Sequence, residues 1–237
     1  LVLLCIAIGL TPAFKMKFWN IGAEGQILMG GMATAALMIY AGDAMPNWLL
    51  LILIFIASAA AGLIWGLIPA VFKAYFNTNE TLFTLMLNYV AMQLVTFAIV
   101  FWENPSGSNT VGIINAAGQK GWFPSIFGNM YGLNVIVVLI ITLGMYVYMK
   151  YSKQGYEIAV VGESQNTARY AGINVKKVII RTMMLSGAIC GIAGCLIVSG
   201  ASHTISTSTA GGRGFTAIIV ALSLIHISEP TRPLYIS

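Results

Sequence analysis

A polar segment at residues 20–26, NIGAEGQ, interrupts the apolar runs of the sequence and is the first candidate for chemistry. Its two glycines permit a broken or re-entrant backbone, which within a membrane is tolerated only against protein or a water-filled cavity. Its hydrogen-bonding side chains are Asn20, Glu24 and Gln26. We predict that they line or gate a cavity. The alternative is an interfacial loop that leaves Glu24 in water near Lys15 and Lys17.

A second polar cluster spans residues 77–89, NTNETLFTLMLNY. Asn79 or the threonine before it can cap the helix that follows, and Glu80 in the first turn suits the helix dipole. Capping does not explain Thr84 and Asn88, which lie four residues apart on a face that also takes Glu80. A polar stripe of this kind in an apolar helix needs partners across the helix bundle or in a pore, because unpartnered polar groups are costly in lipid.

The third candidate is the basic, polar segment 150–181, which apolar runs flank on both sides. Ser164 or Asn166 can cap a short helix there, and Gly172 can end it. The helix between them, QNTARYA, is about two turns long and too short to be stable alone. We therefore expect the flanking helices, and whatever docks on it, to hold it in place.

These segments stand in a chain of 237 residues that is 58% hydrophobic and 8% charged, with a mean hydropathy of +0.86. Soluble domains carry about 25% charged residues, so the composition predicts an all-α polytopic membrane protein. A membrane-spanning helix needs about 20 apolar residues. About six spans and the start of a seventh are expected. They fall at residues 1–14, 26–41, 48–72, 82–102, 133–149, 182–200 and from 215 onward. The second span is short, and we expect the chain to enter it from a broken or re-entrant segment at 20–26.

The distribution of basic residues predicts the orientation of these spans, because cytoplasmic loops are enriched in Lys and Arg. With segment 150–181 in the cytoplasm, the cytoplasmic connections carry Lys15, Lys17, Lys73, Lys150, Lys153, Arg169, Lys176, Lys177 and Arg181. The outer connections carry Lys120 and Arg213. The net charge of +5 therefore follows membrane topology, and no nucleic-acid partner is expected.

Several kinds of chemistry have no motif in this sequence. It contains no GxxxxGK[ST] phosphate loop, so the chain is not expected to hydrolyse nucleotide itself. It also contains no HExxH, CxxC or GxSxG motif. Cys5, Cys190 and Cys195 lie in apolar runs and are expected to be small buried residues without a metal or a disulfide. No catalytic or metal-binding residues, and no enzyme activity, are predicted.

Small residues recur on the expected spans, and they predict close helix packing in lipid. They include Gly30, Gly31, Ser58, Gly62, Gly187, Gly191 and Gly194.

Five stretches carry a resemblance to a known family: FWNIGAEGQ, NETLFTLMLNYVA, GYEIAVVGESQNTARYAGINV, SGAICGIAG and GRGFTAIIVAL. In this order they resemble the permease subunit of the branched-chain amino acid/simple-sugar/nucleoside class of ABC importers. The resemblance covers residues 1–221. Within the class, the chain looks most like the nucleoside-type permeases that work with a basic-membrane-protein lipoprotein, with ribose-type permeases as the alternative.

The resemblance implies a multi-pass subunit of a bacterial-type plasma (inner) membrane, with several partners. Two permease subunits, identical or paralogous, would form the path for a nucleoside or simple sugar. Cytosolic ATPases would bind ATP and push on a coupling helix, and an extracytoplasmic lipoprotein would deliver the substrate. The permease itself would bind no cofactor.

The resemblance also implies roles for particular residues. The coupling helix would be 164–172, with contact candidates Ser164, Asn166, Ala168, Arg169, Tyr170 and Gly172. The candidates for the translocation path or its gates are Asn20, Glu24, Gln26, Glu80, Thr84 and Asn88. The competing hypothesis is an ion-coupled secondary transporter that uses Glu24 and Glu80 and needs no ATPase.

Both ends of this sequence are expected to differ from those of the natural protein. The chain opens at Leu1 inside an apolar run, so we expect the permease domain, 1–221, to be truncated there and at its C-terminal end. Residues 222–233, LSLIHISEPTRP, are similar to a translated reading frame of a common transposase-type sequencing adapter. We therefore expect 222–237 to be a non-native read-through tail. A genuine short polar tail is the alternative.

Overall fold

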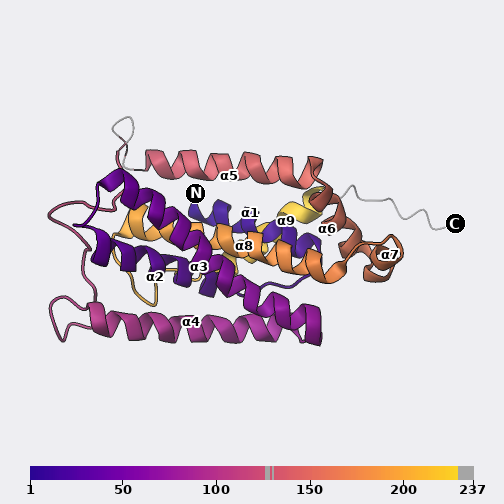
Figure 1. The fold of residues 1–237 in the computed structure, drawn as a ribbon, viewed down its shortest axis with the longest axis horizontal. Helices are drawn as coiled ribbons and strands as arrows, with labels where there is room; N and C mark the ends of the chain where they lie inside the picture. The colour runs from indigo at the N-terminus through magenta and orange to yellow at the C-terminus, as the bar shows by residue number, and fades with distance from the viewer. Residues whose placement is uncertain (126–128, 130, 229–237) are drawn as a thin grey trace.

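The computed structural model describes residues 1–125, 129 and 131–228, and this part of the chain is a bundle of helices joined by loops (Figure 1). In chain order the helices are α1 (Val2–Lys15), α2 (Ala23–Ala41), α3 (Asn47–Phe76), α4 (Glu80–Trp102), α5 (Gly132–Tyr151), α6 (Lys153–Glu163), α7 (Gln165–Tyr170), α8 (Val175–Ile197) and α9 (Arg213–Ser228). A π-helical turn, η1 (Val198–Ser202), extends α8. The all-α prediction is thus confirmed for the described residues.

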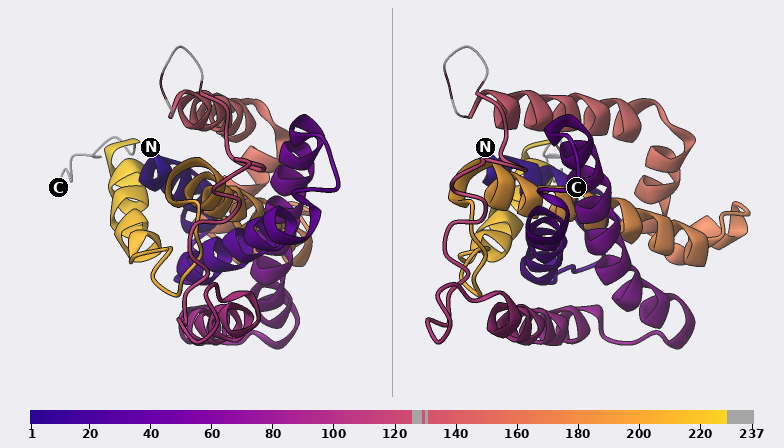
Figure 2. Two further views of the ribbon diagram at one scale, coloured as in Figure 1. Left: turned by 90° about the vertical axis from the view of Figure 1, so that its left-hand side faces the viewer. Right: turned by 60° about the vertical axis from the view of Figure 1, so that its left-hand side comes forward.

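Helix α8 occupies the centre of the bundle, and α1, α2 and α3 pack against it. Helices α4 and α5 lie on opposite sides of this core (Figures 1 and 2). The apolar window of α8 is 78% buried, whereas those of α4 and α5 are 28% and 17% buried. The exposed faces of α4 and α5 are apolar and would face lipid.

Glycines allow the core helices to approach backbone to backbone. A Cβ atom on Gly62 of α3 would collide with the carbonyl oxygen of Gly187 on α8. A Cβ atom on Gly30 of α2 would likewise collide with the backbone of Gly191. The small residues therefore pack α2, α3 and α8 closely together, and this sequence prediction is confirmed.

Four helical segments of the described chain are long and apolar enough to cross a membrane: Asn47–Phe76, Glu80–Trp102, Gly132–Tyr151 and Val175–Ser202. The expectation of about six spans and part of a seventh is confirmed only for these. Helix α1 has 14 residues and is about 21 Å long, against a hydrocarbon core of about 30 Å. Helix α2 has 19 residues, but its first turn carries Glu24 and Gln26 and lowers its hydropathy.

The expected tail overlaps the last helix, because α9 continues through Ser228. The remainder of the tail, residues 229–237, lies outside the described residues.

Candidate functional site

The two polar clusters meet in the structure. The chain breaks between α1 and α2, and the broken backbone lies against α4. The N–H of Ile21 donates to Thr84 Oγ1 (3.2 Å), and the N–H of Gly25 donates to Asn88 Oδ1 (2.9 Å). Asn88 Nδ2 donates in turn to the carbonyl oxygen of Ile21 (2.9 Å). Thr84 and Asn88 are both buried. The hydrogen-bond partners that we expected them to need across the bundle are backbone groups of the break.

The break is also bonded internally. Asn20 Oδ1 accepts from the N–H of Gly22 (3.0 Å), and Asn20 Nδ2 donates to Gln26 Oε1 (3.5 Å). Both side chains are buried. Helix α2 begins at Ala23, earlier than the 26–41 run suggested, and Asn88 supplies an acceptor for one of its unpaired first-turn N–H groups.

The neighbours of Gly25 leave no room for a side chain at this position. A Cβ atom there would lie 2.9 Å from Trp65 Nε1 and 3.0 Å from Asn88 Oδ1. The indole N–H of Trp65 is buried and has no hydrogen-bond partner among the described residues. Sequence analysis missed Trp65, because a tryptophan in an apolar run gives no sign of which backbone it will face.

Glu24 is buried, with 3% of its surface exposed, and it connects α2 to the start of α9. Its Oε1 accepts from the N–H of Gly212 (2.7 Å), and its Oε2 accepts from the N–H of Gly214 (2.8 Å). A carboxylate at a helix N-terminus satisfies unpaired N–H groups and interacts favourably with the helix dipole. The alternative of an interfacial loop with Glu24 in water is therefore wrong.

Glu80 occupies a different environment from Glu24. It is half-buried in the first turn of α4, where its Oε2 lies 2.7 Å from Lys73 Nζ. Asn79 caps α4, because its Oδ1 accepts from the N–H groups of Thr81 (3.1 Å) and Leu82 (3.3 Å). Glu80 thus lies about 6 Å along the helix from Thr84 and about 12 Å from Asn88. The broken segment lies at the level of those two residues, inside the end of the bundle.

The coupling candidates form a capped helix that projects from the same end of the bundle as the ion pair (Figure 1). Ser164 caps α7, because its Oγ accepts from the N–H of Thr167 (3.3 Å). Asn166 is exposed and is not the cap. The chain leaves α7 through Gly172, whose φ of +77° lies in the left-handed region that favours glycine.

One face of α7 anchors it and the other faces outward. Ala168 is fully buried in an apolar cluster with Phe18, Ile158 and Val175. Arg169 is exposed, and Tyr170 is 94% exposed. The flanking helices thus hold this short helix, as the sequence predicted.

Helix α6, which precedes α7, was not predicted. Ser152 caps it by accepting from the N–H of Gly155 (3.0 Å), and Ile158 and Val161 are buried on one face. The capping serine and the i, i+3 apolar pair were the signals that could have found it.

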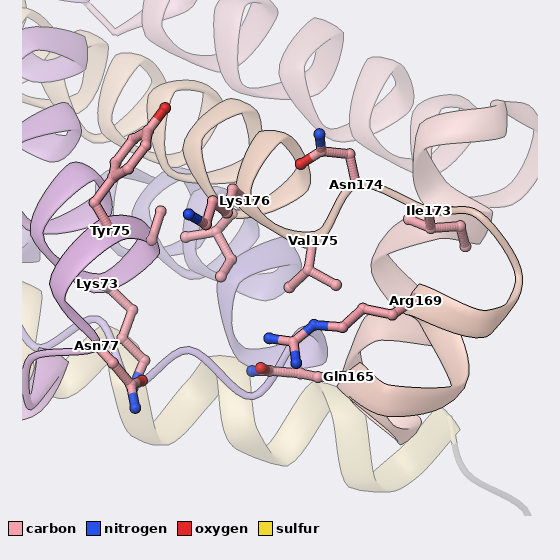
Figure 3. A pocket seen from close by; sticks show the side chains of 11 residues that line it. Lys73, Tyr75, Asn77, Gln165, Arg169, Ile173, Asn174, Val175 and Lys176 are labelled. Carbon is pink, nitrogen blue, oxygen red and sulfur yellow. The ribbon is translucent and has the colours of Figure 1, made fainter.

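A groove of about 540 Å³ lies between the end of α3, helix α7 and the start of α8 (Figure 3). Its lining includes Lys73, Tyr75, Asn77, Gln165, Arg169 and Lys176. Figure 3 shows Arg169 reaching from α7 toward the α3 side of the groove. Sequence analysis did not anticipate that these three segments share a groove, because they are far apart in the chain.

The opposite end of the bundle is covered by residues 103–125, which follow α4. The N–H of Ile114 donates to the carbonyl oxygen of His203 (2.8 Å), and the His203 ring stacks on Trp122 with centroids 3.8 Å apart. Burial lowers the pKa of the His203 imidazole. No group of three His, Cys, Asp or Glu side chains that could hold a metal occurs in the described part of the chain.

The apolar helices long enough to cross a membrane support an integral membrane protein. The chain belongs to the family described as "Branched-chain amino acid transport system / permease component", which matches residues 1–227.

Three similar proteins are ABC transporter permeases. The chain is 34% identical to the guanosine ABC transporter permease protein NupP of Bacillus subtilis, over 89% of this chain and 61% of that protein. It is 28% identical to the nucleoside ABC transporter permease protein NupB of Lactococcus lactis, over 93% and 63%. It is 29% identical to the glucose ABC transporter permease protein TsgB13 of Haloferax volcanii, over 88% and 57%. The chain thus spans roughly three fifths of the length of these relatives. No solved structure matches it significantly.

Proposed function

We propose that this chain is the membrane-spanning permease subunit of an ATP-driven importer of a nucleoside or a simple sugar. Its 150–181 loop would lie in the cytoplasm and couple the path to a cytosolic ATPase. The observation that carries the proposal is α7: a short capped helix, anchored by the fully buried Ala168, that presents Tyr170 outward.

The surroundings of α7 support its role as a transmitter of force. The N–H of Ile173 donates to the carbonyl oxygen of Ala168 (2.9 Å), so the link from α7 to α8 is short and bonded. Helix α8 packs against α2 and α3 through glycine contacts. A push on α7 would therefore be passed to α8 and on to the helices that surround the break.

The chemistry of the polar break supports a path for an uncharged, hydroxyl-rich substrate. Asn20, Gln26, Thr84 and Asn88 are neutral hydrogen-bonding side chains that pair with one another and with the backbone of the break, and a substrate in the path would have to exchange these bonds for its own. The carboxylate of Glu24 is engaged by two N–H groups. Nucleosides and sugars need transient hydrogen bonds rather than ion pairs. The relatives' names favour these substrates, with guanosine as the first to test.

The partners follow from the same proposal. A second permease subunit, identical or paralogous, would complete the path, and an extracytoplasmic substrate-binding lipoprotein would deliver the substrate. ATP would be bound by the ATPase and not by this chain.

The test uses the full-length permease, co-expressed with its ATPase and lipoprotein and reconstituted in proteoliposomes. Tyr170→Ala should lower both ATPase co-purification and ATP-dependent guanosine uptake about tenfold, because exposed aromatic anchors dominate interfaces. The thermal midpoint should not change, because Tyr170 is 94% exposed.

Tyr156→Ala is the matched control, since Tyr156 on α6 is also exposed, at 67%. Equal effects of the two substitutions would refute docking through α7. Uptake that continues without ATP and stops when a proton or sodium gradient is collapsed would favour the ion-coupled alternative. Competition of guanosine uptake by ribose or galactose decides the substrate class.

A further inference from the structure

The groove beside α7 gathers positive charge. Lys73, Arg169 and Lys176 come from α3, α7 and α8 and all line it. Lys73 is paired with Glu80 (2.7 Å), and Lys176 Nζ lies 4.7 Å from the centre of the Tyr75 ring. Arg169 has no ion-pair partner among the described residues, and no Asp or Glu of that part of the chain lines the groove. Its chemistry therefore suits an anion.

The position of Tyr75 suggests that the groove lies at the level of the lipid headgroups. Tyr75 lies in the last turns of α3, is exposed and lines the groove. Tyrosine, with its apolar ring and polar hydroxyl, is enriched at the boundary between hydrocarbon and water. The groove opens beside this tyrosine, at the ends of α3 and α8, two of the helices long and apolar enough to cross a membrane.

We propose that the groove binds the phosphate headgroup of an anionic phospholipid. The Arg169 guanidinium can donate two parallel hydrogen bonds to a phosphate, and Lys176 adds a point charge. Basic pockets between membrane helices on the cytoplasmic side are suited to such headgroups. The bound phosphate would bridge α3 to α7, which no ion pair of the described chain does.

The geometry favours a lipid over a segment of a partner protein. Figure 3 shows the Arg169 side chain in the groove on the α3 side of α7. Tyr170, the residue proposed to meet the ATPase, is almost fully exposed and does not line the groove. The two surfaces of α7 can thus be occupied separately.

The test measures lipid retention on the full-length permease in detergent, with no ATPase or transport assay, so it is independent of the proposed function. Native mass spectrometry would compare added phosphatidylglycerol with phosphatidylcholine of the same acyl chains. Wild-type protein should retain phosphatidylglycerol selectively. The double variant Arg169→Gln/Lys176→Gln should retain it at least tenfold less, since basic residues near the membrane surface attract anionic lipid and the variant removes two of them.

The matched control is Lys153→Gln/Lys177→Gln, which removes the same charge from exposed residues that do not line the groove. An equal loss in this control would overturn the proposal, as would equal retention of phosphatidylcholine. Adducts of inorganic phosphate in place of lipid would assign the groove to a soluble anion. Release of the lipid on adding the ATPase subunit would assign it to the partner protein. The thermal midpoint of the double variant in phosphatidylcholine should match wild type, which separates lost binding from lost folding.

Discussion

At the scale of single residues, the two acidic side chains on which the ion-coupled alternative depends have different surroundings. Glu24 is buried and accepts N–H groups of Gly212 and Gly214, whereas Glu80 is half-buried and paired with Lys73. Glu24 therefore holds the starts of α2 and α9 together. Because each of its carboxylate oxygens accepts a backbone N–H, we interpret Glu24 as a residue that stabilises the fold.

Replacing Glu24 by Gln tests this interpretation. The amide retains one acceptor but places an N–H₂ group against a backbone N–H, so we expect a loss of about 2 kcal/mol in the free energy of unfolding. Equilibrium unfolding in detergent measures it. Guanosine uptake should fall with stability and show no new dependence on proton or sodium gradients.

Glu103 provides a control with the same chemistry in exposed surroundings. Its oxygens accept from the N–H groups of Gly107 (2.8 Å) and Asn109 (3.2 Å). Glu103→Gln should cost less than about 1 kcal/mol, because water replaces the lost bond. If both substitutions had the same small effect, the buried contact of Glu24 would not be structural. Loss of gradient-driven uptake at unchanged stability would instead support ion coupling.

At the scale of elements, the contacts of α8 with α2 and α3 hold the bundle core. Gly191 is the clearest case, because a Cβ atom there would collide with the carbonyl oxygen of Ser58 and lie 3.0 Å from the Cα atom of Gly62. Backbone atoms cannot move aside as the end of a flexible side chain can. The interface thus depends on the absence of a side chain.

Gly191→Ala should lower stability by about 1–3 kcal/mol, the usual cost of overpacking. Gly144→Ala on α5 is the matched control, since a Cβ atom there meets nothing within 4 Å. That substitution should be neutral or stabilise by up to about 1 kcal/mol, because alanine favours helix. Thermal unfolding of both variants in detergent is the measurement, and similar midpoints for the two would contradict the packing described here.

At the scale of the whole molecule, the ends of the bundle are built differently. One end carries α6, α7 and the basic groove, and the other is covered by residues 103–125. His203 joins that cover to the end of α8–η1, through its carbonyl oxygen and its stack on Trp122. The titratable imidazole of His203 therefore lies between residues 103–125 and the end of α8–η1.

The pH dependence of stability should report this contact. Burial holds the pKa of His203 below its ordinary value of 6.5, so the folded protein disfavours the charged ring. Above pH 6.5 the ring is neutral in both the folded and the unfolded protein, so it does not affect the free energy of unfolding. As the pH falls from 6.5 toward the folded-state pKa, the ring is protonated in the unfolded protein first, and the free energy of unfolding decreases. His203→Phe keeps a ring for stacking and should remove this part of the acid-side loss. Thermal midpoints across this range measure it, and an unchanged slope in the variant would contradict the assignment.

The sequence by itself determined that the protein is a helical membrane protein, where its helices can be capped, and which polar side chains need partners. Low charge and long apolar runs dictate helices in a membrane, because a backbone in lipid must satisfy its own hydrogen bonds. Local chemistry likewise limited each cap of α4 and α7 to two candidates, because a cap needs only neighbouring residues. The structure shows that Asn79 and Ser164 are the caps. The polar stripe at Thr84 and Asn88 predicted hydrogen-bond partners across the bundle, and the structure confirms them.

Only the tertiary structure decided which partners met. Glu24 bonds to residues 188 and 190 positions away, and Asn88 bonds to residues 63 and 67 positions away. The groove at Arg169 likewise combines three segments that are distant in the chain. Such contacts depend on how the helices pack against one another, and periodicity along one helix carries no information about the face of another. Helix ends and caps are local, whereas a buried site is made by packing.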